Sequence, residues 1–227
     1  MSELVLPPRA VILDLNGTIL DMEVLLRQDI YAAKNVYGLN LTAEDIVPYW
    51  GKPPLDFLRK IFRQPDGELD KLRASFRQFD SMFPKRPKPG VIRLLRQLDR
   101  VGVTRAISTS GPRVLIDSYL EQAGIPPEGF AFIHGKEETD PATAMGYSPL
   151  APTIAGLARL GIGREETVFV GDEPLNLVEA REANLAFRAV RNIFVPLGRL
   201  TAAGIPAEHI ASGPRALTHM LGIASRV

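Results

Sequence analysis

Residues 21–87 carry the hydrophobic spacing of helices and show no strand pattern. Apolar side chains recur on one face of a predicted helix at Leu26, Ile30, Ala33 and Tyr37. Gly38 follows where such a helix would end. Thr42 with Asp45 predicts the N-terminus of a second helix. Further helices are expected over residues 55–62 and 68–83, so the whole region is predicted to be all-α.

The rest of the chain alternates short apolar runs with helical stripes. Strands are predicted over residues 10–13, 103–108, 130–134 and 167–170. Helices are predicted from Val91 to near Gly102 and over residues 113–123, 154–160 and 175–183, with a loop over residues 135–147. This alternation is typical of a Rossmann-like α/β fold, a parallel sheet with helices on both faces.

The first strand precedes the all-helical region and the other strands follow it. The segment from Pro84 to Gly90 is rich in proline and charge, as expected of a stiff boundary between domains. We therefore predict an α/β core formed by residues 1–20 and 88–227. Residues 21–87 would be a helical cap, inserted over the carboxyl ends of the strands.

Composition narrows the classes of function. The chain is 45% hydrophobic and 23% charged with a net charge of +1, so no basic excess indicates nucleic acid. It has no cysteine, which excludes disulfides and thiolate metal sites. No apolar run approaches the roughly 18 residues of a membrane span, and no signal peptide pattern opens the sequence. We expect a cytoplasmic protein, either a monomer or a homodimer, with no membrane partner.

Polar residues follow two of the predicted strands. Asp14 comes directly after the run 10–13, and Asn16, Gly17 and Thr18 then turn the chain. Open α/β sheets bind ligands in the crevice at the carboxyl ends of their strands, where Asp14 would project. Another predicted strand leads into residues 108–111 (Ser-Thr-Ser-Gly), whose amides precede a helix and are free to bind an anion.

These segments, with residues 168–176 (VFVGDEPLN), resemble the motifs of the haloacid dehalogenase (HAD) superfamily, especially its phosphoglycolate-phosphatase and phosphonatase branches with a helical cap. The resemblance runs over nearly the whole chain, and residues 207–210 with 216–217 look like the family's last strand and helix. It implies that Asp14 is a nucleophile that forms an aspartyl-phosphate. Thr109, or Ser108 if the register shifts by one residue, would hold the phosphoryl group, with amides of Ser110 and Gly111. Mg²⁺ would be bound by Asp14, the backbone carbonyl of Asn16, and Asp172.

Three positions depart from the family pattern. Asn16 replaces the aspartate that protonates the leaving group, and an amide cannot exchange that proton. Tyr147 stands where the family has a phosphate-binding lysine or arginine, and Asn176 replaces a second acidic residue. Lys136, in the loop after the strand 130–134, or Lys52 in the cap could supply the missing positive charge.

Three functions are compatible with these residues. The first is a Mg²⁺-dependent hydrolase that acts on a small phosphorylated metabolite through Asp14. The alternative is a non-catalytic HAD-like protein that binds a phosphorylated ligand or a protein partner. The third is cleavage of a carbon–phosphorus bond, as in phosphonoacetaldehyde hydrolases, in which a cap lysine forms a Schiff base. Lys52 is the only lysine in a comparable position, and its spacing from Gly51 differs from that branch.

Overall fold

The core is a parallel sheet. The computed structural model describes residues 5–49, 60–63, 71, 74, 77–138 and 148–223. Within them, six parallel strands lie in the order β3-β2-β1-β4-β5-β6. The strands are β1 (Ala10–Leu13), β2 (Thr104–Ser108), β3 (Phe132–His134), β4 (Thr167–Gly171), β5 (Ala186–Val190) and β6 (Ile210–Ala211). The predicted parallel α/β class is confirmed.

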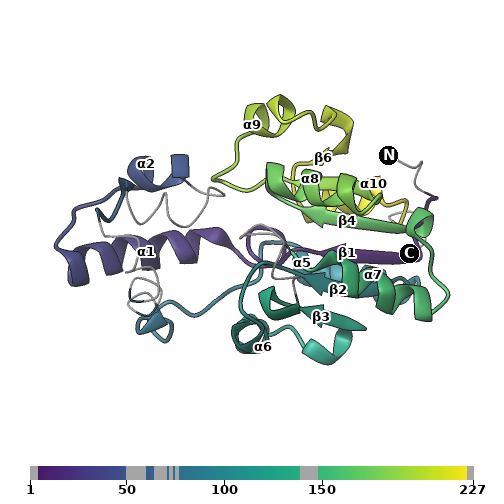
Figure 1. Ribbon diagram of the computed structural model, residues 1–227, viewed down its shortest axis with the longest axis horizontal. Coiled ribbons are helices and arrows are strands. Elements are labelled where there is room, and N and C mark those ends of the chain that lie inside the picture. Colours follow the sequence, from purple (N-terminus) through teal and green to yellow (C-terminus); the bar gives the residue numbers. More distant parts are fainter. Residues whose placement is uncertain are drawn as a thin grey trace.

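Helices cover both faces of this sheet (Figure 1). Side chains of α5 (Val91–Arg100), α6 (Arg113–Gln122) and α10 (Pro214–Met220) pack with Val11 and Leu13. Side chains of α7 (Leu150–Arg159), α8 (Pro174–Glu182) and α9 (Leu197–Ala202) pack with Ala10 and Ile12. Alternate residues of a strand point to opposite faces, so all four residues of β1 are buried.

The register of the strands brings three loops together. Leu13 of β1 is paired with Ile107 of β2 and with Val170 of β4. The loops that follow these strands therefore begin side by side at the carboxyl ends of the strands, with β1 in the centre. We call this end of the sheet the sheet edge. This edge holds Asp14, Thr109 and Asp172.

Two helices form a separate hydrophobic cluster. In Figure 1, α1 (Met22–Tyr37) and α2 (Ala43–Ile46) stand apart from the sheet. Met22, Leu26, Ala33, Ile46 and Phe62 pack there with Phe194, which belongs to the loop after β5. Gly38 ends α1 in the left-handed conformation and Thr42 occupies the N-cap position of α2, both as predicted. The backbone N–H and the hydroxyl of Thr42 both donate to Asp45 Oδ2 at 2.8 Å. The proposed cap boundaries stay a prediction, because residues 50–59, 64–70, 72–73 and 75–76 lie outside the described part of the chain.

Several element boundaries differ from the prediction. Helix α7 begins at Leu150 rather than at residue 154, because Pro152 falls in its first turn, where a missing N–H costs nothing. Strand β3 begins at Phe132 rather than at residue 130. Residues 78–83 form turns instead of a helix, and Phe79 and Phe83 pack there against Tyr31. Strand β5 was not predicted. No helix in the described ranges is long and apolar enough to cross a membrane.

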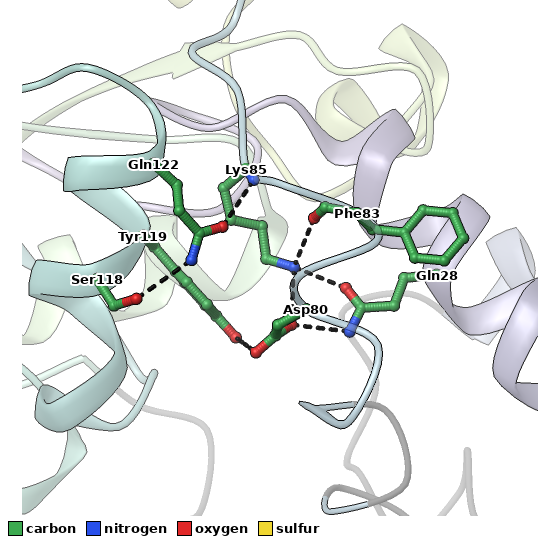
Figure 2. Close-up of polar contacts among 7 residues, drawn as sticks. All are labelled: Gln28, Asp80, Phe83, Lys85, Ser118, Tyr119 and Gln122. Atoms are coloured by element: carbon green, nitrogen blue, oxygen red, sulfur yellow. Dashed lines mark hydrogen bonds and ion pairs between the residues drawn. The ribbon is translucent and has the colours of Figure 1, made fainter.

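A buried polar network joins the helical region to the core (Figure 2). The Lys85 side chain is 1% exposed, and its Nζ donates to Gln28 Oε1 at 2.6 Å and to Asp80 Oδ1 at 3.0 Å. The ammonium also lies 4.9 Å from the ring centroid of Tyr119 on α6, whose hydroxyl donates to Asp80 Oδ2 at 3.4 Å. The backbone N–H of Lys85 donates to Gln122 Oε1. We call Gln28, Asp80, Lys85, Tyr119 and Gln122 the linker network.

Candidate active site

Asp14 lies at the end of β1, in the centre of the sheet edge. Its backbone N–H donates to Val170 O at 2.9 Å, which extends the pairing with β4. Its carboxyl accepts hydrogen bonds from the backbone of Leu15 and from Thr109. Burial raises the pKa of Asp14 to about 7, the two hydrogen bonds oppose this shift, and nearby glutamates add to it. Asp14 is therefore only partly ionised at neutral pH when no cation is near it.

Asp172 follows β4 and is fully buried. Thr18 Oγ1 donates to its Oδ1 at 3.1 Å, and Asn192 Nδ2 donates to its Oδ2. Gly17 packs directly on this carboxyl: a Cβ at Gly17 would lie 2.2 Å from Oδ2, and the backbone there has φ +81°. The turn between β1 and α1 therefore needs glycine at this position.

The two aspartates share one buried site. Their carboxyls are in hydrogen-bonding contact, and burial together with the charge of Asp14 raises the pKa of Asp172 well above its usual value. Two desolvated carboxylates repel each other, and a divalent cation with oxygen ligands would relieve this repulsion. Asn16, whose backbone carbonyl is the expected ligand, also has a buried side-chain Oδ1 with no hydrogen-bond partner among the described residues. The donor set thus fits Mg²⁺ at Asp14, Asn16 and Asp172.

The loop after β2 lies beside this pair. Thr109 is buried and contacts Asp14, whereas Ser110 is exposed and Gly111 is half-buried. The hydroxyl of Ser108 is buried, with no hydrogen-bond partner in the described part of the chain. The structure therefore brings Thr109 to the carboxylate and leaves Ser110 at the surface of the same loop.

Of the three positions considered for the positive charge, the structure describes only Lys136. Lys136 follows β3, its backbone N–H donates to Gly111 O at 2.9 Å, and its side chain is exposed. It is thus adjacent to the anion-binding loop, and its role stays a prediction. Lys52 and Tyr147 lie outside the described residues.

Asn176 serves as a cap in this structure. Its Oδ1 accepts from the backbone N–H groups of Asp172 and Glu173, both at 3.1 Å, and its Nδ2 donates to Glu179 Oε2. Glu179 in turn accepts from the backbone N–H of Ser148 at 2.6 Å. The oxygen of Asn176 is therefore used to hold the backbone of Asp172 at the start of α8.

Two residues of the site, Lys88 and Asn192, were not found by motif matching, and Thr18 was predicted only as part of a turn. Lys88 lies in the segment predicted only as a domain boundary, yet its Nζ donates to Gly17 O at 2.7 Å and to Arg191 O at 2.6 Å. Desolvation lowers the pKa of Lys88 to about 8, and the charges of Asp172 and Asp21 oppose that shift. Lys88 thus places a cation near Asp172.

Known proteins resemble this chain in sequence and in fold. The sequence model of the family described as "Haloacid dehalogenase-like hydrolase" matches residues 11–190. The pyrophosphatase PpaX of Oceanobacillus iheyensis is 26% identical over 190 residues, which cover 80% of this chain and 83% of that protein. The phosphoglycolate phosphatase of Xanthomonas campestris pv. campestris (strain 8004) is 26% identical over 183 residues, with 78% and 80% covered.

Among solved structures, a haloacid dehalogenase-like family hydrolase from Streptococcus pneumoniae superposes with a TM-score of 0.74 at 18% identity, covering 94% of this chain and 98% of that one. That likeness concerns the fold. The family assignment rests on the sequence match, which spans most of the chain and includes Asp14, Thr109 and Asp172. The chain belongs to the haloacid dehalogenase-like hydrolase family.

Proposed function

We propose that this chain is a Mg²⁺-dependent phosphatase that acts on a small phosphorylated metabolite, with Asp14 as the nucleophile. The observation that carries the proposal is the buried contact between the carboxyls of Asp14 and Asp172, beside the hydroxyl of Thr109. The names of the relatives, a pyrophosphatase and a phosphoglycolate phosphatase, support phosphate as the group transferred.

In this proposal the ionised carboxylate of Asp14 attacks phosphorus, and the bond from phosphorus to the leaving oxygen breaks. Thr109 and the amides of Ser110 and Gly111 hold the phosphoryl oxygens. Mg²⁺, when bound by Asp14, Asp172 and the carbonyl of Asn16, would neutralise part of the charge on nucleophile and phosphate. Water then hydrolyses the aspartyl-phosphate and restores Asp14.

Asn16 limits which substrates suit such a site. An alkoxide must be protonated as it leaves, and the amide of Asn16 has no proton to give at neutral pH. A phosphate or phenolate leaves as a stable anion and needs no such proton. We therefore infer that phosphoanhydrides such as pyrophosphate, or activated esters, are cleaved faster than alkyl esters such as phosphoglycolate.

The test is hydrolysis of pyrophosphate, p-nitrophenyl phosphate and phosphoglycolate, each with Mg²⁺ or with chelator, by the wild type and by Asp14→Asn. We expect Mg²⁺-dependent turnover that Asp14→Asn abolishes, with the alkyl ester slowest. Turnover that persists in Asp14→Asn, or no turnover of any substrate, would overturn the proposal. The non-catalytic alternative finds no support in the comparisons, and the phosphonoacetaldehyde alternative depends on Lys52.

A further inference from the structure

Lys88 is linked to both oxygens of Asp172 through two turns of the backbone. Its ammonium donates to the carbonyls of Gly17 and Arg191. The residues that directly follow these two, Thr18 and Asn192, are the ones whose side chains donate to Oδ1 and Oδ2 of Asp172. We propose that Lys88 is a positioning residue, which fixes both turns and thereby orients the Asp172 carboxylate toward Asp14.

The backbone holds Lys88 in place for this role. Its N–H donates to Ile19 O at 2.8 Å, and the N–H of Asp21 donates to Arg86 O at 2.9 Å. Leu20 and Pro87 form an antiparallel bridge between these two bonds. The linker that returns from the helical region is therefore paired with the turn that follows Asp14, and the Lys88 side chain starts from a fixed point.

Asn192 is oriented by a second set of bonds. Its Oδ1 accepts from the backbone N–H groups of Phe194 at 2.6 Å and Val195 at 2.8 Å. The oxygen end of the amide therefore faces its own loop, and the nitrogen end faces Asp172. The carbonyl of Arg191, held by Lys88, fixes where this loop leaves β5. A shift of the loop would move the Asn192 donor away from Asp172.

The positioning role requires a long side chain that carries a positive charge and more than one hydrogen-bond donor. An ammonium has three N–H donors and binds two carbonyls at once, whereas a methionine side chain of similar length binds neither. Lys88 also lines an open cleft of about 670 Å³, together with Gly17, Arg191 and Asn192. Because solvent reaches this cleft, water can replace the ammonium at both carbonyls in Lys88→Met, so that variant is expected to fold.

The experiment compares the wild type, Lys88→Met, Lys88→Arg and a control, Lys34→Met, in which an exposed lysine of α1 is changed. The first measurement is the exchange rate of the Asn192 side-chain amide protons by NMR in the metal-free protein. We expect exchange about tenfold faster in Lys88→Met and close to the wild type in Lys88→Arg and Lys34→Met. This measurement requires neither turnover nor a bound metal.

The second measurement is Mn²⁺ affinity, followed by electron paramagnetic resonance, and this part rests on the proposed function. Loss of a group that orients a metal ligand typically lowers affinity about 10–100-fold, and we expect about tenfold for Lys88→Met. Unchanged exchange of Asn192 in a folded Lys88→Met would overturn the positioning role. Faster exchange with unchanged or tighter Mn²⁺ binding would overturn its link to the metal. A wild type that binds no Mn²⁺ would instead refute the proposed metal site, while the exchange data still decide the role of Lys88.

Discussion

Two lysines of the same linker, Lys85 and Lys88, have opposite surroundings. Lys85 is buried in the linker network, where Asp80 balances its charge and Gln28 accepts a second hydrogen bond. Lys88 is half-buried, and the oxygens that it binds are backbone carbonyls. Its nearest opposing charges, Asp172 and Asp21, act from beyond hydrogen-bond contact.

This difference indicates that the linker network contributes to stability, whereas the carboxyls at the sheet edge contribute to function. In the linker network every charge has its partner, so the network fixes how the chain enters and leaves the helical region. At the sheet edge, two carboxyls are buried together and their pKa values are raised, which costs folding energy. Such uncompensated charge is typical of sites that bind ions or react.

The largest effect is expected from Asp172→Asn. We predict a loss of Mg²⁺-dependent turnover on the order of 10³-fold, about 4 kcal/mol, because a carboxylate ligand of the proposed metal is removed. The melting temperature of the metal-free variant should equal or exceed that of the wild type, since the repulsion from Asp14 is relieved. Asp117→Asn, at an exposed position of α6, is the matched control. A variant that is inactive and also strongly destabilised would contradict the separation of the two regions.

Lys85→Met should affect stability. We predict a loss of about 3 kcal/mol in the free energy of unfolding, because Asp80 is left without its counter-ion; partial exposure of Asp80 keeps the loss at the low end of the range for buried pairs. Urea unfolding measures this. Lys34→Met should change it by no more than about 0.5 kcal/mol. Equal losses in both variants would show that the linker network adds no stability.

Asn16→Asp should increase turnover. We predict a gain of about 10²-fold, about 2.7 kcal/mol, because a general acid is restored. The gain should be greatest for phosphoglycolate, whose alkoxide needs a proton, and smaller for p-nitrophenyl phosphate. Measured kcat/KM values for both esters test this. Equal gains for the two would contradict the inference that the leaving group limits the wild type.

The raised pKa of Asp14 also predicts that stability depends on pH. The pKa of Asp14 rises from 3.8 in the unfolded chain to about 7 in the fold, so the folded state keeps a proton that the unfolded state has lost. Stability should therefore fall as pH rises from about 4 to about 7, by up to about 1.4 kcal/mol per pH unit, and Asp14 should add no further slope above that window. In metal-free Asp14→Asn this slope should be smaller. Identical curves for the two proteins would refute the shift.

The sequence predicts the core well because runs of apolar residues mark the buried strands. Ala10–Leu13 and Thr167–Gly171 are wholly buried strands, and each leads into an acidic residue that the fold brings to one edge. Strand β5 escaped prediction because Arg188 interrupts its short apolar run and no chemical motif follows it directly.

The supporting residues of the site could not be read from sequence in the same way. Lys88 binds carbonyls 71 and 103 positions away, and every residue has a carbonyl, so no residue type marks the partner. Asn176 looks like a weakened metal ligand in the motif, yet the fold uses its oxygen for two backbone N–H groups of its own helix start. Sequence motifs identify the groups that contact a ligand. Only the fold shows which other residues position those groups.

Asn16 and Gly17 are neighbours with very different mutational freedom. At Gly17 any side chain would enter the carboxyl of Asp172, so every substitution of this glycine adds a clash there. At Asn16 the side-chain oxygen engages nothing in the described residues, and an aspartate has the same shape. Asparagine and aspartate codons differ by a single base. The route to a proton-donating side chain is thus one base substitution long, and the new side chain has the same shape as the old one.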